Sequence, residues 1–89
     1  MTTETYINHP TFGLLYRLCL VEKNEELFTT LYAQRLFFRV KIEVRETFFE
    51  PLTRSEARMM MESKLRNLRS DGEWNTYKQI NEVYQRTFQ

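Results

Sequence analysis

The chain has 89 residues, of which 42% are hydrophobic and 28% are charged, so its composition is that of one compact folded unit rather than a disordered segment. Thirteen basic side chains nearly balance twelve acidic ones, and the formal net charge is +1. This balance argues against a dedicated nucleic-acid-binding protein, whose phosphate contacts require an excess of basic residues.

The N-terminal residues are polar and lack the basic start and apolar core of a signal peptide. No apolar run approaches the roughly 20 residues that span a bilayer. The single cysteine, Cys19, lies within the apolar residues 18–21 and has no second cysteine with which to form a disulfide or a zinc site. We therefore expect a soluble, cytoplasmic protein that makes no membrane contact and has a buried Cys19.

The first half of the chain predicts short strands. Residues 13–21 are almost continuously apolar, which is typical of a central or covered strand. The charged residues 22–26 predict a turn, and a second strand is expected at residues 27–32.

Residues 36–45 alternate in polarity and are expected to break into two strands. A last short strand is expected at residues 47–50, before Pro51. Such strands without intervening helices predict a small curled antiparallel sheet or barrel. The alternation assigns Leu36, Phe38, Val40, Ile42 and Val44 to a dry face, and Phe37, Arg39, Lys41, Glu43 and Arg45 to a wet one.

The second half of the chain predicts two helices. Thr53 and Glu56 fit a capping box at the start of the first helix, and Gly72 suits the residue after its end. The short connection makes the two helices antiparallel neighbours. The apolar stripe of the first helix comprises Ala57, Met60, Met61, Leu65 and Leu68, and that of the second comprises Trp74, Tyr77, Ile80, Tyr84 and Phe88.

No residue pattern in the chain predicts catalysis. The one histidine, His9, has no serine, cysteine or carboxylate at a suggestive spacing. Two glycines cannot supply a phosphate-binding loop, and no carboxylates stand at metal-ligand spacing. We expect a protein that is not an enzyme and that holds no cofactor and no metal.

The most informative segment is residues 29–39, where Tyr32, Gln34 and Arg35 stand beside Leu36 and Phe38. Tyrosine and arginine next to aliphatic groups are enriched at protein–protein hot spots. If the strand runs unbroken, Tyr32 and Gln34 share its inner face with Leu36 and Phe38. A turn near residues 33–35 would instead project the polar ones outward as a recognition surface, so both interpretations remain open.

Basic residues favour a second hypothesis, a nucleic-acid-binding or RNA-polymerase-binding module. Arg39, Lys41 and Arg45 share one strand face, but Glu43 interrupts them. The first predicted helix also carries basic residues, but acidic residues lie between them, so we expect an ordinary solvated face. These basic residues are Arg54, Arg58, Lys64, Arg66 and Arg69.

The whole chain resembles the PipX family, the small PII-interacting proteins of cyanobacteria. The resemblance is strongest over residues 6–16, which include Asn-His-Pro-Thr-Phe-Gly-Leu-Leu-Tyr, and over residues 27–38, which include Tyr-Ala-Gln-Arg-Leu-Phe-Phe. It is weakest over residues 39–50. It implies an α+β fold, with a five-stranded Tudor-like (KOW-like) barrel domain at residues 1–52 and a helical hairpin at residues 53–89.

The resemblance also implies a function. Members of the family are non-enzymatic adaptors that ADP-bound PII trimers sequester when 2-oxoglutarate is low. When 2-oxoglutarate is high, they act as coactivators of the transcription factor NtcA, a dimer. We expect no direct DNA contact, and the resemblance makes the helices candidates for contacting RNA polymerase. We expect a monomer when the protein is free. By motif position, the shared partner-binding surface comprises Glu4, Tyr6, Tyr32, Gln34, Arg35, Leu36 and Phe38.

Overall fold

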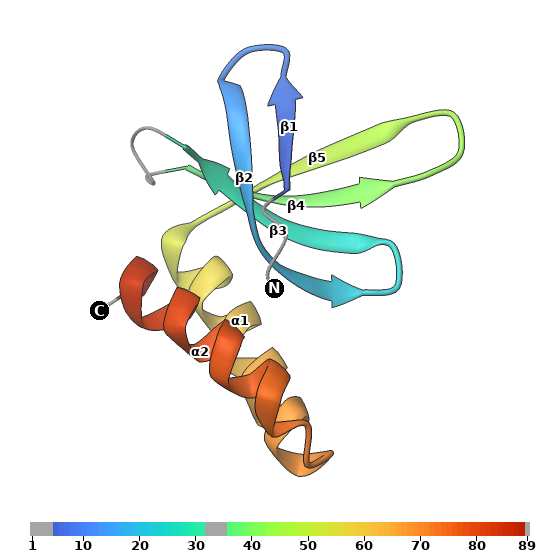
Figure 1. Ribbon diagram of the computed structural model, residues 1–89. Coiled ribbons are helices and arrows are strands. Elements are labelled where there is room, and N and C mark those ends of the chain that lie inside the picture. The colour runs from blue at the N-terminus through green and yellow to red at the C-terminus, as the bar shows by residue number, and fades with distance from the viewer. Residues whose placement is uncertain (1–4, 32–35, 89) are drawn as a thin grey trace.

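The computed structural model describes residues 5–31 and 36–88. These residues form one five-stranded antiparallel sheet followed by two helices, which confirms the expected α+β class (Figure 1). Each strand pairs with the next strand along the chain, and the sheet curls into a half-barrel. The elements are β1 (Tyr6–His9), β2 (Gly13–Glu22), β3 (Glu25–Thr30), β4 (Phe37–Ile42), β5 (Thr47–Leu52), α1 (Arg54–Ser70) and α2 (Trp74–Phe88).

The strand boundaries differ from the sequence-based expectation in several places; β3, for example, covers residues 25–30 rather than 27–32, so the turn before it is shorter than residues 22–26. The predicted split within residues 36–45 is wrong, because β4 is a single strand and residues 43–46 form its turn to β5. The fifth strand is instead β1, whose four residues are too few to give a clear alternation; it pairs with β2 from Tyr6 opposite Tyr16 to His9 opposite Gly13. Pro51 lies within β5, at the sheet edge where a proline costs no ladder hydrogen bond.

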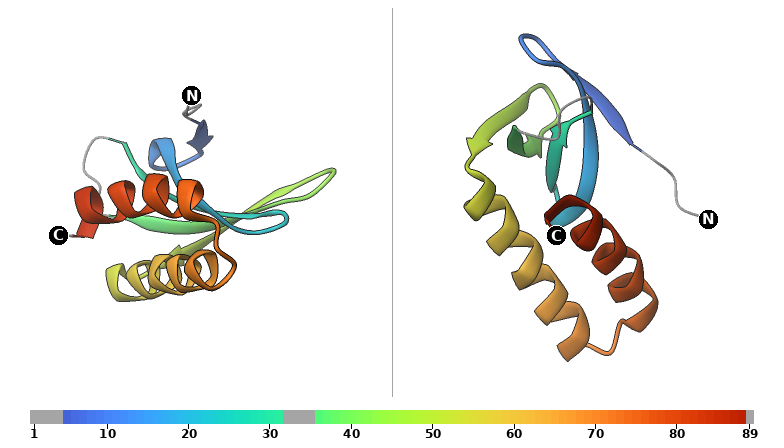
Figure 2. Two further views of the ribbon diagram at one scale, coloured as in Figure 1. Left: turned by 60° about the horizontal axis from the view of Figure 1, so that its bottom comes forward. Right: turned by 90° about the vertical axis from the view of Figure 1, so that its left-hand side faces the viewer.

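The sheet buries side chains on both faces, which corrects the expected division into a dry and a wet face. Phe37, placed on the wet face by alternation, is 1% exposed and packs against the helices. Leu36, Ile42 and Val44, placed on the dry face, are exposed. Alternation fails here because α1 and α2 cover the second face of the sheet (Figure 2).

Two hydrophobic clusters result from this arrangement. The cluster on one face consists of sheet residues alone, namely Leu15, Phe28, Phe38 and Val40. The cluster on the other face joins sheet and helices, and consists of Leu18, Cys19, Leu27, Phe37, Ala57, Met61, Leu65, Tyr84 and Phe88. The hairpin and the sheet therefore share one of the two cores.

Local signals in the sequence fix the ends of α1. The Thr53 hydroxyl accepts a hydrogen bond from the Glu56 amide, and the Glu56 carboxylate accepts one from the Thr53 amide, which confirms the capping box. At the other end Gly72 has a φ of 72°, and its amide donates to the Arg69 carbonyl. The Glu73 amide donates to the Leu68 carbonyl, which completes a Schellman motif and turns the chain into α2.

The helical stripes are largely as expected, with Met61, Leu65 and Leu68 buried and Met59 exposed. Trp74 is the exception, since it is 57% exposed. It is the first residue of α2, at the turn that lies farthest from the sheet, so no strand is available to cover it (Figure 1). Its ring contacts Tyr77 with centroids 5.6 Å apart.

Candidate functional site

The predicted partner-binding residues divide into three groups. Glu4, Tyr32, Gln34 and Arg35 lie outside the described residues. Tyr6 and Leu36 are 41% and 42% exposed, as a surface role requires. Phe38 is 3% exposed and belongs to the sheet-only cluster.

The segment that carries Tyr32, Gln34 and Arg35 is anchored at both of its ends. The Leu36 carbonyl accepts hydrogen bonds from the Thr29 hydroxyl at 2.8 Å and from the Thr30 amide at 3.1 Å. The Leu31 amide donates to the Leu14 carbonyl of β2 at 3.2 Å. The start and end of this connection are therefore fixed to the sheet.

Tyr6 lies at the same level of the sheet as this connection. Strand pairing places Tyr6, Tyr16, Thr29 and Phe37 in one transverse row, so Tyr6 is three strands away from the β4 end of the connection. At the usual strand spacing this is about 14 Å. A single partner can therefore reach both Tyr6 and Leu36.

Tyr16 links Tyr6 to the helices, a role that no pattern in the sequence predicted. The rings of Tyr6 and Tyr16 have centroids 5.7 Å apart. The Arg86 guanidinium of α2 donates to the Tyr16 hydroxyl at 3.4 Å. Tyr16 was expected only as part of an apolar strand face, because the docking of α2 cannot be inferred from β2 alone.

An aromatic cluster surrounds Phe38 and includes the only histidine of the chain. The His9 ring has centroids 5.0 Å from Phe12, 5.0 Å from Phe38 and 4.7 Å from Phe49. Its Nδ1 accepts hydrogen bonds from the amides of Thr11 and Phe12 at 3.0 and 3.2 Å. His9 thus closes the β1–β2 turn, which gives it a structural role.

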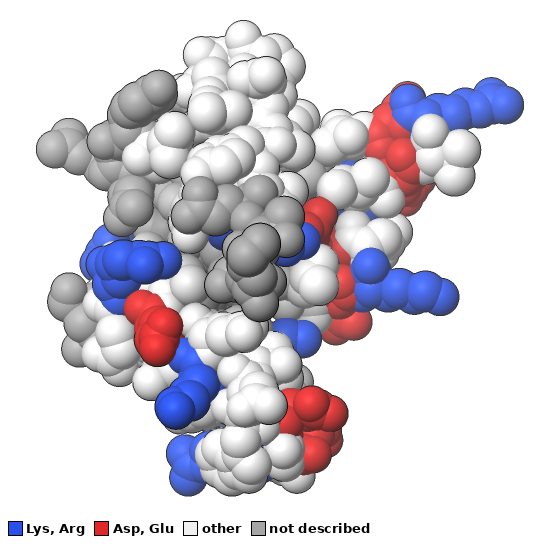
Figure 3. Space-filling model, viewed as in Figure 1, with Lys and Arg blue, Asp and Glu red and all other residues white. Residues whose placement is uncertain are grey.

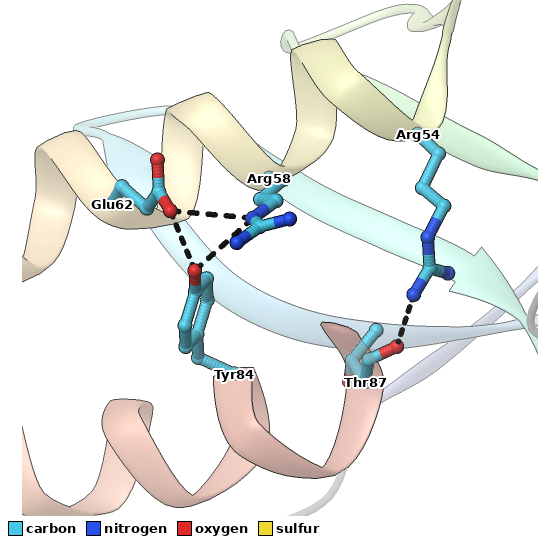
Figure 4. A network of polar contacts seen from close by, with 5 residues as sticks. All are labelled: Arg54, Arg58, Glu62, Tyr84 and Thr87. Carbon is cyan, nitrogen blue, oxygen red and sulfur yellow. Dashed lines mark hydrogen bonds and ion pairs between the residues drawn. The ribbon is translucent and has the colours of Figure 1, made fainter. Parts of the chain in front are cut away.

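Two arginines of α1 are engaged with α2 (Figure 4). Arg58 donates from Nε to the Tyr84 hydroxyl at 3.2 Å and to Glu62 at 3.3 Å, while the Tyr84 hydroxyl donates to Glu62 at 2.5 Å. The Tyr84 hydroxyl, followed by Arg58, holds the pKa of Glu62 below its usual range. Arg54 donates to the Thr87 carbonyl at 3.2 Å, and its guanidinium lies 5.1 Å from the centre of the Phe88 ring.

The basic residues of β4 pair with carboxylates. Arg39 bonds Glu50 from Nε at 2.6 Å and lies 3.6 Å from Glu25, while Lys41 lies 3.6 Å from Glu43. Figure 3 shows basic and acidic side chains side by side at the ends of the β2–β3 and β4–β5 hairpins. The surface over the β1–β2 hairpin is uncharged in this view. This neutralisation weakens the case for phosphate binding by β4.

Cys19 is 4% exposed, as expected, and burial raises the pKa of its thiol to about 12. It is therefore protonated at neutral pH and is not a nucleophile. Within residues 5–31 and 36–88, no three His, Cys, Asp or Glu side chains are grouped to hold a metal ion. Neither helix is long and apolar enough to cross a bilayer.

Comparison with known families decides the relationship of this chain. The model of the family "PipX: PII-interacting protein X" matches residues 3–88, which is nearly the whole sequence. The chain belongs to the PipX family. Comparison with curated proteins gave no significant match. PipX members are PII-interacting regulatory proteins, and the match covers the sheet, the 31–36 connection and both helices.

Proposed function

We propose that this protein is a non-enzymatic regulatory adaptor that exchanges between two protein partners. ADP-bound PII sequesters it when 2-oxoglutarate is low, and it serves as a coactivator of NtcA when 2-oxoglutarate is high. The observation that carries this proposal is the match of the PipX family to residues 3–88. The protein acts in the cytoplasm and is a monomer when free.

The proposed contact surface is the 31–36 connection together with the edge of β1. Leu36 and Tyr6 supply exposed apolar area. Phe38 is buried against His9 and Phe49, so its proposed role is to hold β4 in place next to Leu36 rather than to touch a partner. The remaining proposed contacts are Glu4, Tyr32, Gln34 and Arg35.

Competition between the partners follows if both use this surface. No chemistry in this chain is then needed for switching, because the ligand state of each partner sets its own affinity. Each tenfold change in affinity corresponds to about 1.4 kcal/mol, so a modest ligand effect on either partner redistributes the protein.

The deciding experiment is calorimetric titration of this protein into a PII trimer, first with ADP and then with ATP plus 2-oxoglutarate. We expect binding in the first condition and its loss in the second. Binding that is equal in both conditions would contradict the switch, and no binding in either would contradict the adaptor role itself.

Variants of the connection test whether the surface is shared. Tyr32→Ala should weaken both complexes by about 2 kcal/mol or more, as expected for a central aromatic anchor. Trp74→Ala is the matched control, because Trp74 is an exposed aromatic residue at the far end of the hairpin. Loss of one complex alone would show that the two surfaces differ.

Arg35→Lys tests the geometry of the same surface. A planar bidentate donor becomes a point charge, so this substitution should weaken both complexes although the charge is kept. Unchanged affinity for both partners would remove Arg35 from the site.

Contact with RNA polymerase through the helices is a further part of the proposal, with Met59, 66% exposed on α1, as the residue to change. We do not propose direct DNA contact, because Arg39 and Lys41 have carboxylate partners. A band shift on DNA or RNA in low salt, abolished by moderate salt, would instead favour the nucleic-acid-binding alternative.

A further inference from the structure

A cleft of about 400 Å³ runs between β2 and α2, and Tyr16 is one of the residues that line it. Its volume is in the range of small-molecule sites. Leu18 and Cys19 of β2 and Ile80 and Val83 of α2 line it with apolar surface. No function discussed above uses this cleft.

The charges around the cleft are predominantly positive. Arg17, Lys64 and Arg86 line it, against one acid, Glu82. Arg17 is held by Glu26 at 2.8 Å. Among residues 5–31 and 36–88, no carboxylate lies within salt-bridge distance of Lys64 or Arg86.

Two of these charges also act on the apolar side of the cleft. Burial is the largest influence on the Cys19 thiol and raises its pKa, while the positive charges of Lys64 and Arg17 act more weakly in the opposite direction. Among the described residues Lys64 has no carboxylate partner, and Arg86 donates to the uncharged Tyr16 hydroxyl at 3.4 Å. Apolar walls beside these two cations are complementary to a molecule that has an apolar body and one anionic group.

We propose that this cleft binds a small amphipathic carboxylate. The apolar chain lies along Leu18, Ile80 and Val83, and the carboxylate lies within reach of Lys64 or Arg86. The proposal does not depend on PII binding, since it concerns a different surface and can fail or succeed on its own.

The test uses the full-length protein and three ligands with the same eight-carbon chain, namely octanoate, 1-octanol and octylammonium. Amide chemical shifts from NMR titration report both the affinity and the site. We expect octanoate to shift the resonances of Leu18, Ile80 and Val83. Octanol should bind there more weakly, and octylammonium should not bind there.

Variants identify the cation that holds the carboxylate. Lys64→Met keeps the length of the apolar stem, and Arg86→Gln provides a second, more exposed position. At least one of them should weaken octanoate binding about fivefold, the upper range for a partly exposed ion pair. Lys78→Met is the matched control, because Lys78 is an exposed lysine of α2 that does not line the cleft.

Three results would overturn the proposal. The first is the absence of shifts at the cleft residues up to the highest soluble octanoate concentration. The second is equal binding of octanoate and octylammonium, which would leave the cations without a role. The third is unchanged octanoate affinity in both Lys64→Met and Arg86→Gln.

Discussion

Phe37 on β4 stacks on Phe88 of α2, with ring centroids 5.4 Å apart and ring planes 22° from parallel. This contact joins the sheet to the last turn of the chain. Both rings are almost fully buried, and the Arg54 guanidinium lies over the Phe88 ring. The helical hairpin is thus attached to the sheet beside the residues that close the 31–36 connection.

Loss of the contact between these two rings should destabilise the fold. Phe88→Ala removes a buried ring and should lower the free energy of unfolding by about 3 kcal/mol or more. Phe48→Ala is the matched control, because Phe48 is 47% exposed, and its loss should stay within about 1 kcal/mol. Urea unfolding followed by circular dichroism measures both. Equal small losses would show that α2 does not dock on the sheet in solution.

The hydroxyl of Tyr84 should control the acidity of Glu62. It is the main cause of the lowered pKa of that carboxyl, so Tyr84→Phe should move the pKa of Glu62 up toward its ordinary value of 4.5. Carbon NMR titration of the side-chain carboxyl measures the shift. Tyr77→Phe, on the same helix, is the control and should leave the pKa of Glu62 in place.

The same network gives a pH dependence of stability. A carboxyl whose folded-state pKa lies below its unfolded value stabilises the fold at pH values above the unfolded pKa. For Glu62 and Glu56 this contribution should decline as pH falls from 4.5 through the lower folded-state values. Tyr84→Phe should therefore flatten the acid limb of the stability curve, and an unchanged slope would contradict the assignment.

The N-terminal cap of α1 provides a further prediction. Thr53→Ala removes the acceptor for the Glu56 amide and should cost about 1 kcal/mol. The pKa of Glu56 should rise only in part, because its largest cause, the hydrogen bond from the Thr53 backbone amide, remains in the alanine variant and only the smaller contribution of the hydroxyl is lost. Ser55→Ala, an exposed position in the first turn, is the control and should be nearly neutral. Urea unfolding at neutral and acidic pH separates these effects.

The two ends of α1 were predicted correctly, whereas the burial of two aromatic residues was not. The capping box at Thr53 and the turn at Gly72 depend on a few adjacent residues, so both could be read directly. The burial of Phe37 and the exposure of Trp74 depend on where α1 and α2 lie relative to the sheet. No pattern within β4 or α2 contains that information.

The candidate site divides in the same way. The residue types of the 31–36 connection indicated a recognition surface, and the position of Leu36 at its end is consistent with that interpretation. The link from Tyr6 through Tyr16 to Arg86 was not predicted, because it joins residues from three distant segments. The cleft beside β2 was missed for the same reason.

His9 should be found in one neutral tautomer. Two backbone amides donate to Nδ1, so the proton of the neutral ring must be on Nε2. Nitrogen NMR at mildly alkaline pH distinguishes the two ring nitrogens, and we expect an unprotonated Nδ1. A protonated Nδ1 would show that the β1–β2 turn is not closed by His9.

The ion pair between Arg17 and Glu26 should matter more than the surface pair between Arg39 and Glu50. Glu26 is only 7% exposed, and its carboxylate lies 2.8 Å from Arg17. Glu26→Gln keeps the shape but leaves a half-buried guanidinium without its counter-charge, which should cost about 2 kcal/mol. Glu50→Gln removes the same charge from a 53% exposed side chain and should cost less than about 1 kcal/mol. Both substitutions are isosteric and both lie in the sheet, so their free energies of unfolding, measured with urea, can be compared directly. Equal losses of this free energy would mean that water solvates Arg17 when Glu26 is replaced.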